Sequence, residues 1–416
     1  MSLSLENQTA RNTRLAELQT MLGEQNARAE QDRLIASPGT TEEVAAVLRW
    51  TTQHSLSVTP QGSGTKAGWL NAASADLTLS LLRLRSFQRA SDNPQNVTVG
   101  AGIRWAQLQE QLRHAGQRLP LDAHRATDAT VGGVLSTNDS GLLRLRHGAA
   151  RELVTATTLV LADGTILRSD EQPTDALHPL ARSYDLTQLL IGSFGTLAVL
   201  TEATLRTSPL SPPAATFTLR APDALELAAV MKAILGASLP LERLQMRNES
   251  HAFALDVELA TDTLKPEQER LEQLAGSLPC SLAQLPVWQS RSQALSTPNA
   301  TVLRITALPA KLAPLVAGFA HLAQHPEYEF RAVADPTGIV TVSCQAPKET
   351  LLTLIDDLRA RLASSGGTVT VLERGNLSEE VDRWALPPHV LEIMRSVKQE
   401  FDPKKILNPG RFAGGI

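Results

Sequence analysis

The first half of the chain alternates between segments with helical spacing of hydrophobic positions and shorter segments with strand-like alternation. Residues 1–36 are mostly polar, and the helical spacing of Leu15, Leu18 and Leu22 predicts a single amphipathic helix. A second helix through Gln53 is expected after Ser37 to Thr40, because a capping residue is followed there by acidic residues. The other elements expected in this half are strands at 56–58, 77–84, 97–102 and 155–162 and a helix at 105–114.

The segment from Ser208 to Pro213 is the clearest boundary in the chain, since its three prolines can continue neither a helix nor a sheet. After it, helical and strand-like segments recur in two similar sets. This weak repeat predicts an antiparallel sheet with helices on one face, which is a separate α+β domain. The expected strands are 217–220, 241–247, 253–259, 302–308, 327–333, 339–344 and 368–373, and the expected helices are 223–235, 266–274, 310–323, 348–362 and 388–400.

The loop Pro60-Gln61-Gly62-Ser63-Gly64-Thr65-Lys66-Ala67-Gly68 is interpreted as a phosphate cradle. Its glycines let a polyphosphate approach the backbone, and Ser63, Thr65 and Lys66 supply hydroxyl and ammonium donors. A nicotinamide-dinucleotide fingerprint would require a helix to start inside the motif, and a loop and a strand follow instead. An ordinary glycine-rich turn remains the alternative for this loop taken alone.

Two further stretches are rich in small residues. In 127–141, backbone groups and the hydroxyls of Thr130, Ser136 and Thr137 could approach a ligand, although a tightly packed helix start is the alternative. In 184–205, a helix is expected to end at Gly192, and the chain then turns through Gly195 into a strand. His147 lies in a loop between arginines, where a structural role is more common than catalysis.

Composition and charge narrow the function classes. The chain has 42% hydrophobic and 20% charged residues and a net charge of -4, which gives no electrostatic case for nucleic acid or an acidic membrane surface. Cys280, Cys344 and the nine histidines show no metal-ligand spacing, so no metal site is expected. The N-terminus has no apolar signal region and no run is long enough to span a bilayer, so we expect a cytoplasmic protein that reaches the inner membrane only through partners.

Six segments together resemble the vanillyl-alcohol oxidase and p-cresol methylhydroxylase (PCMH) family of flavoproteins, and within it the FAD-binding subunits of glycolate oxidases. They occur in the order found in the family, within residues 38–208 and 371–416. The segments are the cradle at 60–68, Ala129 to Gly133, Arg146-x-Gly148-x-x-Arg151-Glu152-Leu153-Val154 ahead of Ala162-Asp163-Gly164, Tyr184-Asp185-Leu186, Gly192 to Leu197, and Asp402-Pro403 to Asn408-Pro409-Gly410-Arg411.

The resemblance implies an α+β fold in which a two-subdomain PCMH-type domain holds FAD. The expected segments are an N-terminal helical extension (1–36), the FAD-binding domain (37–208), an α+β cap or substrate domain (214–373) and a C-terminal segment that returns to the FAD domain (374–416). The cradle has neither of the residues that attach flavin covalently in relatives, histidine and cysteine, so FAD is expected to be non-covalent. The implied cofactor-binding residues are Pro60, Gln61, Gly62, Ser63, Gly64, Thr65, Lys66, Thr127, Ala129, Thr130, Val131, Gly132, Gly133, Ser136, Thr137, Asn138, Gly192, Gly195, Thr196, Leu197, Val199 and Asn408.

The sequence departs from the family where relatives bind a metal and a 2-hydroxy acid. The family motif H-x-G-D-G-N has no histidine here, since the comparable stretch is Ala334-Asp335-Pro336-Thr337-Gly338-Ile339-Val340. We therefore expect an FAD-binding subunit of a glycolate-type oxidase or dehydrogenase complex, with a second flavoprotein subunit and an iron–sulfur subunit as partners. The alternatives are a self-sufficient 2-hydroxy-acid dehydrogenase, with a carboxylate clamp from Arg304, Arg331 or Arg374, and a non-catalytic assembly subunit. No catalytic residue is assigned.

Overall fold

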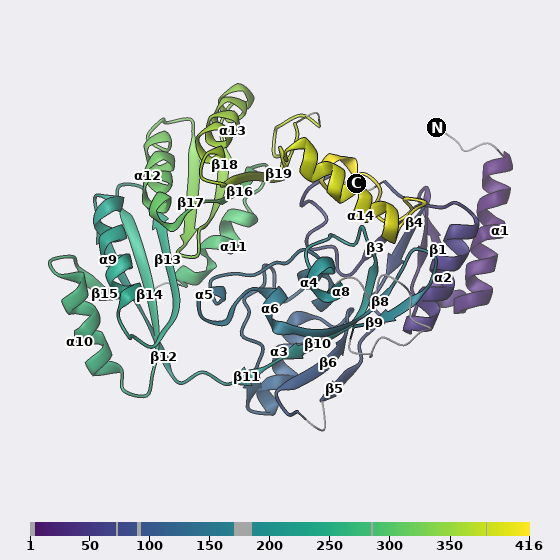
Figure 1. Ribbon diagram of the computed structural model, residues 1–416, viewed down its shortest axis with the longest axis horizontal. Coiled ribbons are helices and arrows are strands. Elements are labelled where there is room, and N and C mark those ends of the chain that lie inside the picture. Colours follow the sequence, from purple (N-terminus) through teal and green to yellow (C-terminus); the bar gives the residue numbers. More distant parts are fainter. Residues whose placement is uncertain (1–4, 72–73, 90–92, 170–184, 284–285, 380) are drawn as a thin grey trace. The chain divides into compact units, whose positions relative to one another are not determined.

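The computed structural model describes residues 5–71, 74–89, 93–169, 185–283, 286–379 and 381–416 (Figure 1). Tyr184, part of one family segment, lies outside these residues. The chain forms two compact units. Unit 1 consists of residues 1–140, 149–209 and 386–416, and unit 2 consists of residues 141–148 and 210–385.

The first half of unit 1 is a four-stranded sheet in the order β1-β2-β4-β3, with two helices. The β2-β4 and β4-β3 pairs are parallel, and β1-β2 is antiparallel. Its core consists of the apolar stripes of both helices and the strand side chains, among them Leu18, Val44, Leu48 and Leu77. The elements are α1 (Leu5–Leu22), η1 (Glu24–Asn26), β1 (Ala27–Glu30), β2 (Arg33–Ala36), α2 (Thr41–Gln53), β3 (Val58–Gln61) and β4 (Leu77–Ser80).

The second half of unit 1 is a five-stranded antiparallel sheet in the order β5-β6-β10-β8-β9. The alternating side chains of β10 place Val199, Ala203 and Leu205 in buried positions. The elements are β5 (Phe87–Arg89), β6 (Asn96–Gly100), α3 (Trp105–His114), β7 (Gln117–Arg118), α4 (Val131–Ser136), α6 (Ala150–Leu153), β8 (Val154–Val160), β9 (Ile166–Arg168), α8 (Leu186–Leu190), β10 (Val199–Arg206) and β11 (Ser208–Pro209).

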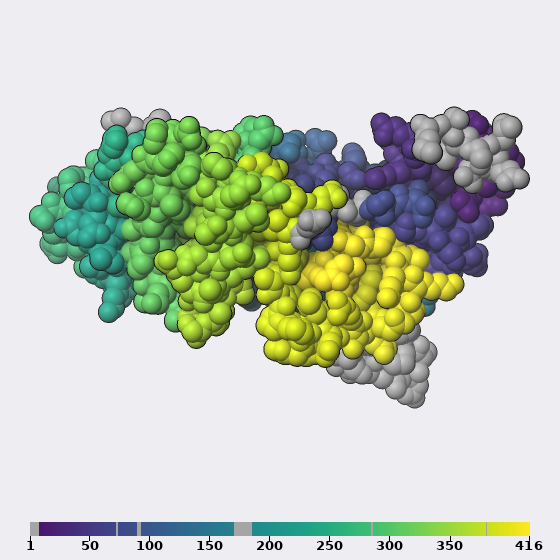
Figure 2. Space-filling model, turned by 90° about the horizontal axis from the view of Figure 1, so that it is seen from above, coloured from purple at the N-terminus to yellow at the C-terminus, as the bar shows by residue number. Residues whose placement is uncertain are grey.

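The C-terminal part of unit 1 joins the first sheet at its β3 edge. After α14 (Pro388–Phe401), the chain lies beside Val58, whose N–H donates to Ile406 O at 2.7 Å and whose carbonyl accepts from Asn408 N at 2.8 Å. Leu407 is fully buried in the same core as α2. In Figure 2 this segment is yellow and lies against the purple and blue residues of the N-terminal part of the unit. The chain thus returns to the β3 strand from which the predicted cradle emerges.

Unit 2 is built on an eight-stranded antiparallel sheet in the order β15-β12-β14-β13-β17-β18-β16-β19 (Figure 1). Its core contains the inward side chains of the strands and of the longer helices. The elements are α5 (Arg144–His147), β12 (Ala214–Ala221), α9 (Ala224–Gly236), β13 (Leu241–Asn248), β14 (Phe253–Ala260), α10 (Leu264–Ala275), β15 (Cys280–Leu282), η2 (Val287–Gln289), α11 (Ser290–Leu295), β16 (Thr301–Thr306), η3 (Pro309–Lys311), α12 (Leu312–Leu322), β17 (Glu329–Asp335), β18 (Ile339–Gln345), α13 (Lys348–Ala363) and β19 (Thr368–Glu373).

Four local expectations were wrong. Residues 1–36 are not one helix, because β1 and β2 follow α1; each strand has only four residues and few buried positions, so alternation could not reveal them. The strand expected at 77–84 ends at Ser80, and the strand expected at 56–58 begins only at Val58 and continues through Gln61. Ser208–Pro209 pairs briefly with Gln117–Arg118 although prolines were expected to exclude pairing. In addition, residues 141–148, which lie within the segment 37–208, pack with unit 2.

Candidate cofactor site

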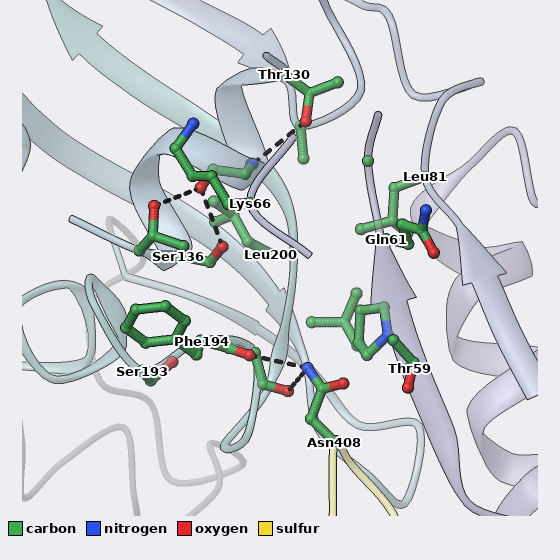
Figure 3. A pocket seen from close by; sticks show the side chains of 18 of the residues that line it. Thr59, Gln61, Lys66, Leu81, Thr130, Ser136, Ser193, Phe194, Leu200 and Asn408 are labelled. Carbon is green, nitrogen blue, oxygen red and sulfur yellow. Dashed lines mark hydrogen bonds between the residues drawn. The ribbon is translucent and has the colours of Figure 1, made fainter. Parts of the chain in front are cut away.

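A cleft in unit 1 brings together segments that are far apart in the sequence (Figure 3). Its walls come from the end of β3 and the loop after it, from α4, from β8, from the turn 193–200 and from the C-terminal segment. The empty space amounts to about 1030 Å³, part of it open to solvent.

The cradle loop 62–66 offers backbone donors in a crowded place. No hydrogen bond to another described residue uses the N–H of Ser63, Gly64 or Thr65, and the buried Oγ of Ser63 has none either. A side chain at Gly62 would collide with Oγ1 of Thr130, and Gly64 has a φ of +74°. The loop thus has unused N–H groups, and at Gly62 it has room only for glycine. Both features suit an anionic ligand such as a pyrophosphate.

The α4 segment lets a ligand approach its backbone closely, but it does not supply backbone donors. The N–H groups of Val131 and Gly132 donate to the carbonyls of Ile103 and Ala101, at 3.0 and 2.8 Å, so they are not available to a ligand. Thr130 caps the helix by accepting from Gly133 N at 3.3 Å. This stretch is therefore both a tightly packed helix start and a segment that a ligand can approach, because the capped start of α4 forms one wall of the cleft.

The turn before β10 and the C-terminal segment form the opposite wall. Asn408 Nδ2 donates to Phe194 O at 2.8 Å and to Gly195 O at 3.4 Å. These bonds fix the orientation of the amide, and its buried Oδ1 has no partner among the described residues. The N–H groups of Gly195 and Leu197 also lack a described acceptor. Among the lining residues, this wall therefore presents the Oδ1 of Asn408 as an acceptor and the N–H of Gly195 as a donor, as a ligand with polar ring edges requires.

Buried cations surround the cleft. Lys66 Nζ lies 3.3 Å from Asp139 Oδ2 and 3.4 Å from His124 O, so its ammonium is already paired inside the protein. Arg411 also lines the cleft, and burial lowers the pKa of its guanidinium. Behind the turn 193–196, Lys398 Nζ contacts Asp402 Oδ2 at 2.7 Å; burial lowers the lysine pKa and the Asp402 charge opposes that shift.

Most of the predicted cofactor residues lie together in this cleft, and the others do not line it. Ala129 and Val131 are in the hydrophobic core, Leu197 is buried, and Thr196 donates its hydroxyl to Ser193 O. Thr127 is exposed. Asn138 and Gly192 also lie outside the lining. The predicted residues that line the cleft are Pro60, Gln61, Gly62, Ser63, Gly64, Thr65, Lys66, Thr130, Gly132, Gly133, Ser136, Thr137, Gly195, Val199 and Asn408.

The sequence reasoning missed several lining residues. Thr59 lies on β3 and its buried Oγ1 has no described partner, and Thr157 and Leu159 on β8 face the same space. A strand residue on a cleft wall has the same alternation as one on a core face, so only the three-dimensional arrangement separates them. Arg411 belongs to the C-terminal segment that resembles the family. The sequence does not show that this residue lies beside the cradle loop.

The histidines near these segments have structural partners. In unit 2, His147 Nε2 lies 3.4 Å from Glu242 Oε1, and Arg146 Nη1 lies 3.3 Å from Oε2 of the same buried glutamate. This geometry favours the structural role expected for His147. Within the residues that the structure describes, no three histidine, cysteine, aspartate or glutamate side chains form a group that could hold a metal ion. No described helix is both long and apolar enough to cross a bilayer.

Comparison with known proteins identifies the domains. The chain matches an FAD binding domain over residues 33–170 and the C-terminal domain of FAD linked oxidases over residues 334–412. A D-2-hydroxyglutarate dehydrogenase of Xanthomonas citri pv. viticola is 33% identical, over 53% of this chain and 45% of the relative. The mitochondrial D-2-hydroxyglutarate dehydrogenase of Bos taurus is 26% identical, over 91% of this chain and 76% of the relative.

Glycolate oxidase subunit GlcD of Bacillus subtilis is 22% identical, over 91% of this chain and 88% of the relative. The chain thus spans less than half of the Xanthomonas protein and most of the Bacillus protein. A solved structure of alkyldihydroxyacetonephosphate synthase has a TM-score of 0.67 at 16% identity, over 90% of this chain and 75% of that one, and this likeness establishes the fold.

The fold, the cleft and its unused donors define a protein that binds a flavin dinucleotide. The chain contains an FAD binding domain and the C-terminal domain of FAD linked oxidases, it has the two-domain PCMH-type α+β fold that the sequence predicted, and its cofactor is FAD.

Proposed function

We propose that this chain is the FAD-binding subunit of a 2-hydroxy-acid oxidase or dehydrogenase complex of the glycolate type. The observation that carries the proposal is the set of relatives named for 2-hydroxy acids, together with a cleft whose walls fit FAD. Bound FAD accepts the two electrons released when a CH–OH group becomes C=O. The chain's own residues hold the cofactor: the loop 62–65 at the pyrophosphate, and Asn408 with the turn 193–199 at a polar ring edge.

The stretch that carries the metal motif in relatives is a tight turn here. Between β17 and β18, Asp335 Oδ1 accepts from Thr337 N at 2.8 Å, and Gly338 has a φ of +102°. Asp335, Thr337 and Gly338 thus close a hairpin, which supports a subunit whose substrate site is completed by a second flavoprotein chain.

All three arginine candidates for a carboxylate clamp already have interactions within the chain. Arg331 pairs with Glu329 at 2.6 Å, and Arg374 Nη2 donates to Glu379 O at 2.7 Å. Arg304 lies between the core residues Leu303 and Ile305, on the face of the sheet opposite their side chains. None of the three arginines therefore stands out as the partner of a substrate carboxylate.

Purification of the tagged chain from its native cells tests the proposal. We expect a second flavoprotein and an iron–sulfur protein to be retained from the cytoplasmic fraction, and dye reduction with glycolate or D-lactate by the complex but not by the chain alone. Turnover by the isolated chain at the rate of the complex would favour the self-sufficient enzyme. A complex in which this chain holds no FAD would favour the assembly subunit. FAD should leave the protein on denaturation, because the cradle has no residue that attaches it.

A further inference from the structure

We propose that residues 406–411, the C-terminal clamp, hold both walls of the FAD cleft, and that Arg411 is the positioning residue for the cradle. The inference rests on FAD as the cofactor and not on the identity of the substrate. It assigns a role to a segment at the opposite end of the chain from the cradle.

Arg411 binds the second part of the cradle loop through three backbone carbonyls. Its Nη2 donates to Lys66 O at 2.9 Å, and its Nη1 donates to Ala67 O at 3.3 Å and to Asn71 O at 3.1 Å. A planar guanidinium that meets three carbonyls fixes their relative orientation, which a flexible ammonium cannot do equally well. The contact begins one residue after the three unused N–H groups of Ser63 to Thr65.

A hydrogen bond also runs in the opposite direction, from the segment after the cradle loop to the clamp. Asn71 Nδ2 donates to Gly410 O at 3.0 Å, so the clamp and the cradle are joined in both directions. At the other end of the clamp, Asn408 donates to the carbonyls of the turn 194–195, and its N–H donates to Val58 on β3. The turn 194–195 and the distant segment formed by β3 and the cradle loop therefore share one support.

The clamp is itself anchored from behind. Lys398 Nζ donates to Thr196 O at 2.6 Å and to Leu407 O at 2.9 Å, while Asp402 accepts from the N–H groups of Ile406 and Leu407 at 3.0 and 2.7 Å. Both side chains are almost fully buried. The tail is thus held in one position before any ligand binds.

The arrangement has two consequences for an anionic cofactor. A loop that is already ordered does not have to lose conformational freedom on binding, which favours tight binding. In addition, the described acceptors of Arg411 are neutral carbonyls, so its positive charge remains to favour a pyrophosphate at the cleft wall.

The test compares FAD binding by Arg411→Met, Arg411→Lys and the control Arg395→Met. Arg395 is an exposed arginine on α14 in the same part of the chain. The cofactor-free full-length proteins are titrated with FAD by fluorescence, and their melting temperatures are measured without FAD. We expect Arg411→Met to raise the Kd for FAD at least about tenfold, Arg411→Lys to recover part of that loss through its charge, and Arg395→Met to leave the Kd unchanged.

An unchanged Kd in a folded Arg411→Met protein would overturn the proposal. If that variant does not fold, Arg411→Lys and Asn71→Ala decide instead: weaker FAD binding by folded proteins upholds the clamp, and wild-type Kd values in both overturn it. A wild-type chain that binds no FAD would refute the cofactor, and hydroxy-acid turnover does not enter the readout, so failure of the clamp is distinct from failure of the proposed function.

Discussion

Replacing Gly62 by alanine is expected to weaken FAD binding about 10- to 100-fold. The added Cβ would collide with Thr130 Oγ1, so either the cradle loop or the capping threonine has to move. Thr130 is almost fully buried and caps α4, which leaves it little freedom to rotate away. Overpacking of this kind costs roughly 1–3 kcal/mol, and a factor of ten in binding corresponds to about 1.4 kcal/mol. The measurement is the Kd for FAD of the cofactor-free protein.

Gly236→Ala and Gly318→Ala are matched controls for this change. Nothing lies within 4 Å of a Cβ built at either position, and neither residue requires a positive φ. Both variants should bind FAD like the wild type. Equal Kd values for Gly62→Ala and these controls would mean that the cradle loop does not touch the cofactor.

Replacing Lys398 by methionine should destabilise unit 1 by roughly 3–5 kcal/mol, because it leaves the buried carboxylate of Asp402 without its cation. Two carbonyl acceptors, on Thr196 and Leu407, also lose their donor. The loss should appear as a lower free energy of unfolding in urea, measured on the cofactor-free chain by a probe of unit 1. FAD binding should weaken as well, because the turn 193–199 and the clamp lose their common support.

Lys405→Met is the control for this prediction, since Lys405 is exposed two residues before Leu407. Surface substitutions of this kind usually change stability by less than about 0.5 kcal/mol. If Lys398→Met is as stable as Lys405→Met, the buried pair does not hold the tail. A double variant, Lys398→Met with Asp402→Asn, should recover part of the loss, because no buried charge is left unpaired and the amide oxygen still offers an acceptor to the N–H groups of Ile406 and Leu407.

Much of the fold was predictable from the periodicity of hydrophobic residues and from the capping, glycine and proline residues that end helices and strands. The helices at 41–53 and 105–114 and the two αβ sets of unit 2 lie close to where the patterns place them, because each has a long apolar face or a clear alternation. The strands β1 and β2 were missed for the opposite reason. Four residues with one or two buried positions carry too little pattern to distinguish a strand from the end of a polar helix.

The cofactor site was predictable where it depends on glycines and hydroxyls. The cradle and the α4 segment are recognisable because small residues cluster there for a steric reason, as the collision at Gly62 illustrates. Whether an individual polar group is available to a ligand or already paired within the protein was not predictable. The sequence suggested that Lys66 offers an ammonium to phosphate, whereas the structure pairs that ammonium with Asp139, a residue 73 positions away in the chain.

The backbone donors of α4 illustrate the same limit. Gly132 follows a capping threonine, which is typical of a helix start that binds anions through its N–H groups. In the fold, carbonyls of Ala101 and Ile103 already occupy the N–H groups of Gly132 and Val131. Which donors stay unused depends on tertiary neighbours, and local sequence does not contain that information.

Hydrogen–deuterium exchange of the chain with and without FAD tests the central claim most directly. The account predicts that FAD slows exchange at Ser63, Gly64, Thr65, Gly195 and Leu197, whose N–H groups have no described acceptor. Val131 and Gly132 should change little because their N–H groups are already bonded. Protection confined to unit 2, or no protection in either loop at saturating FAD, would contradict it.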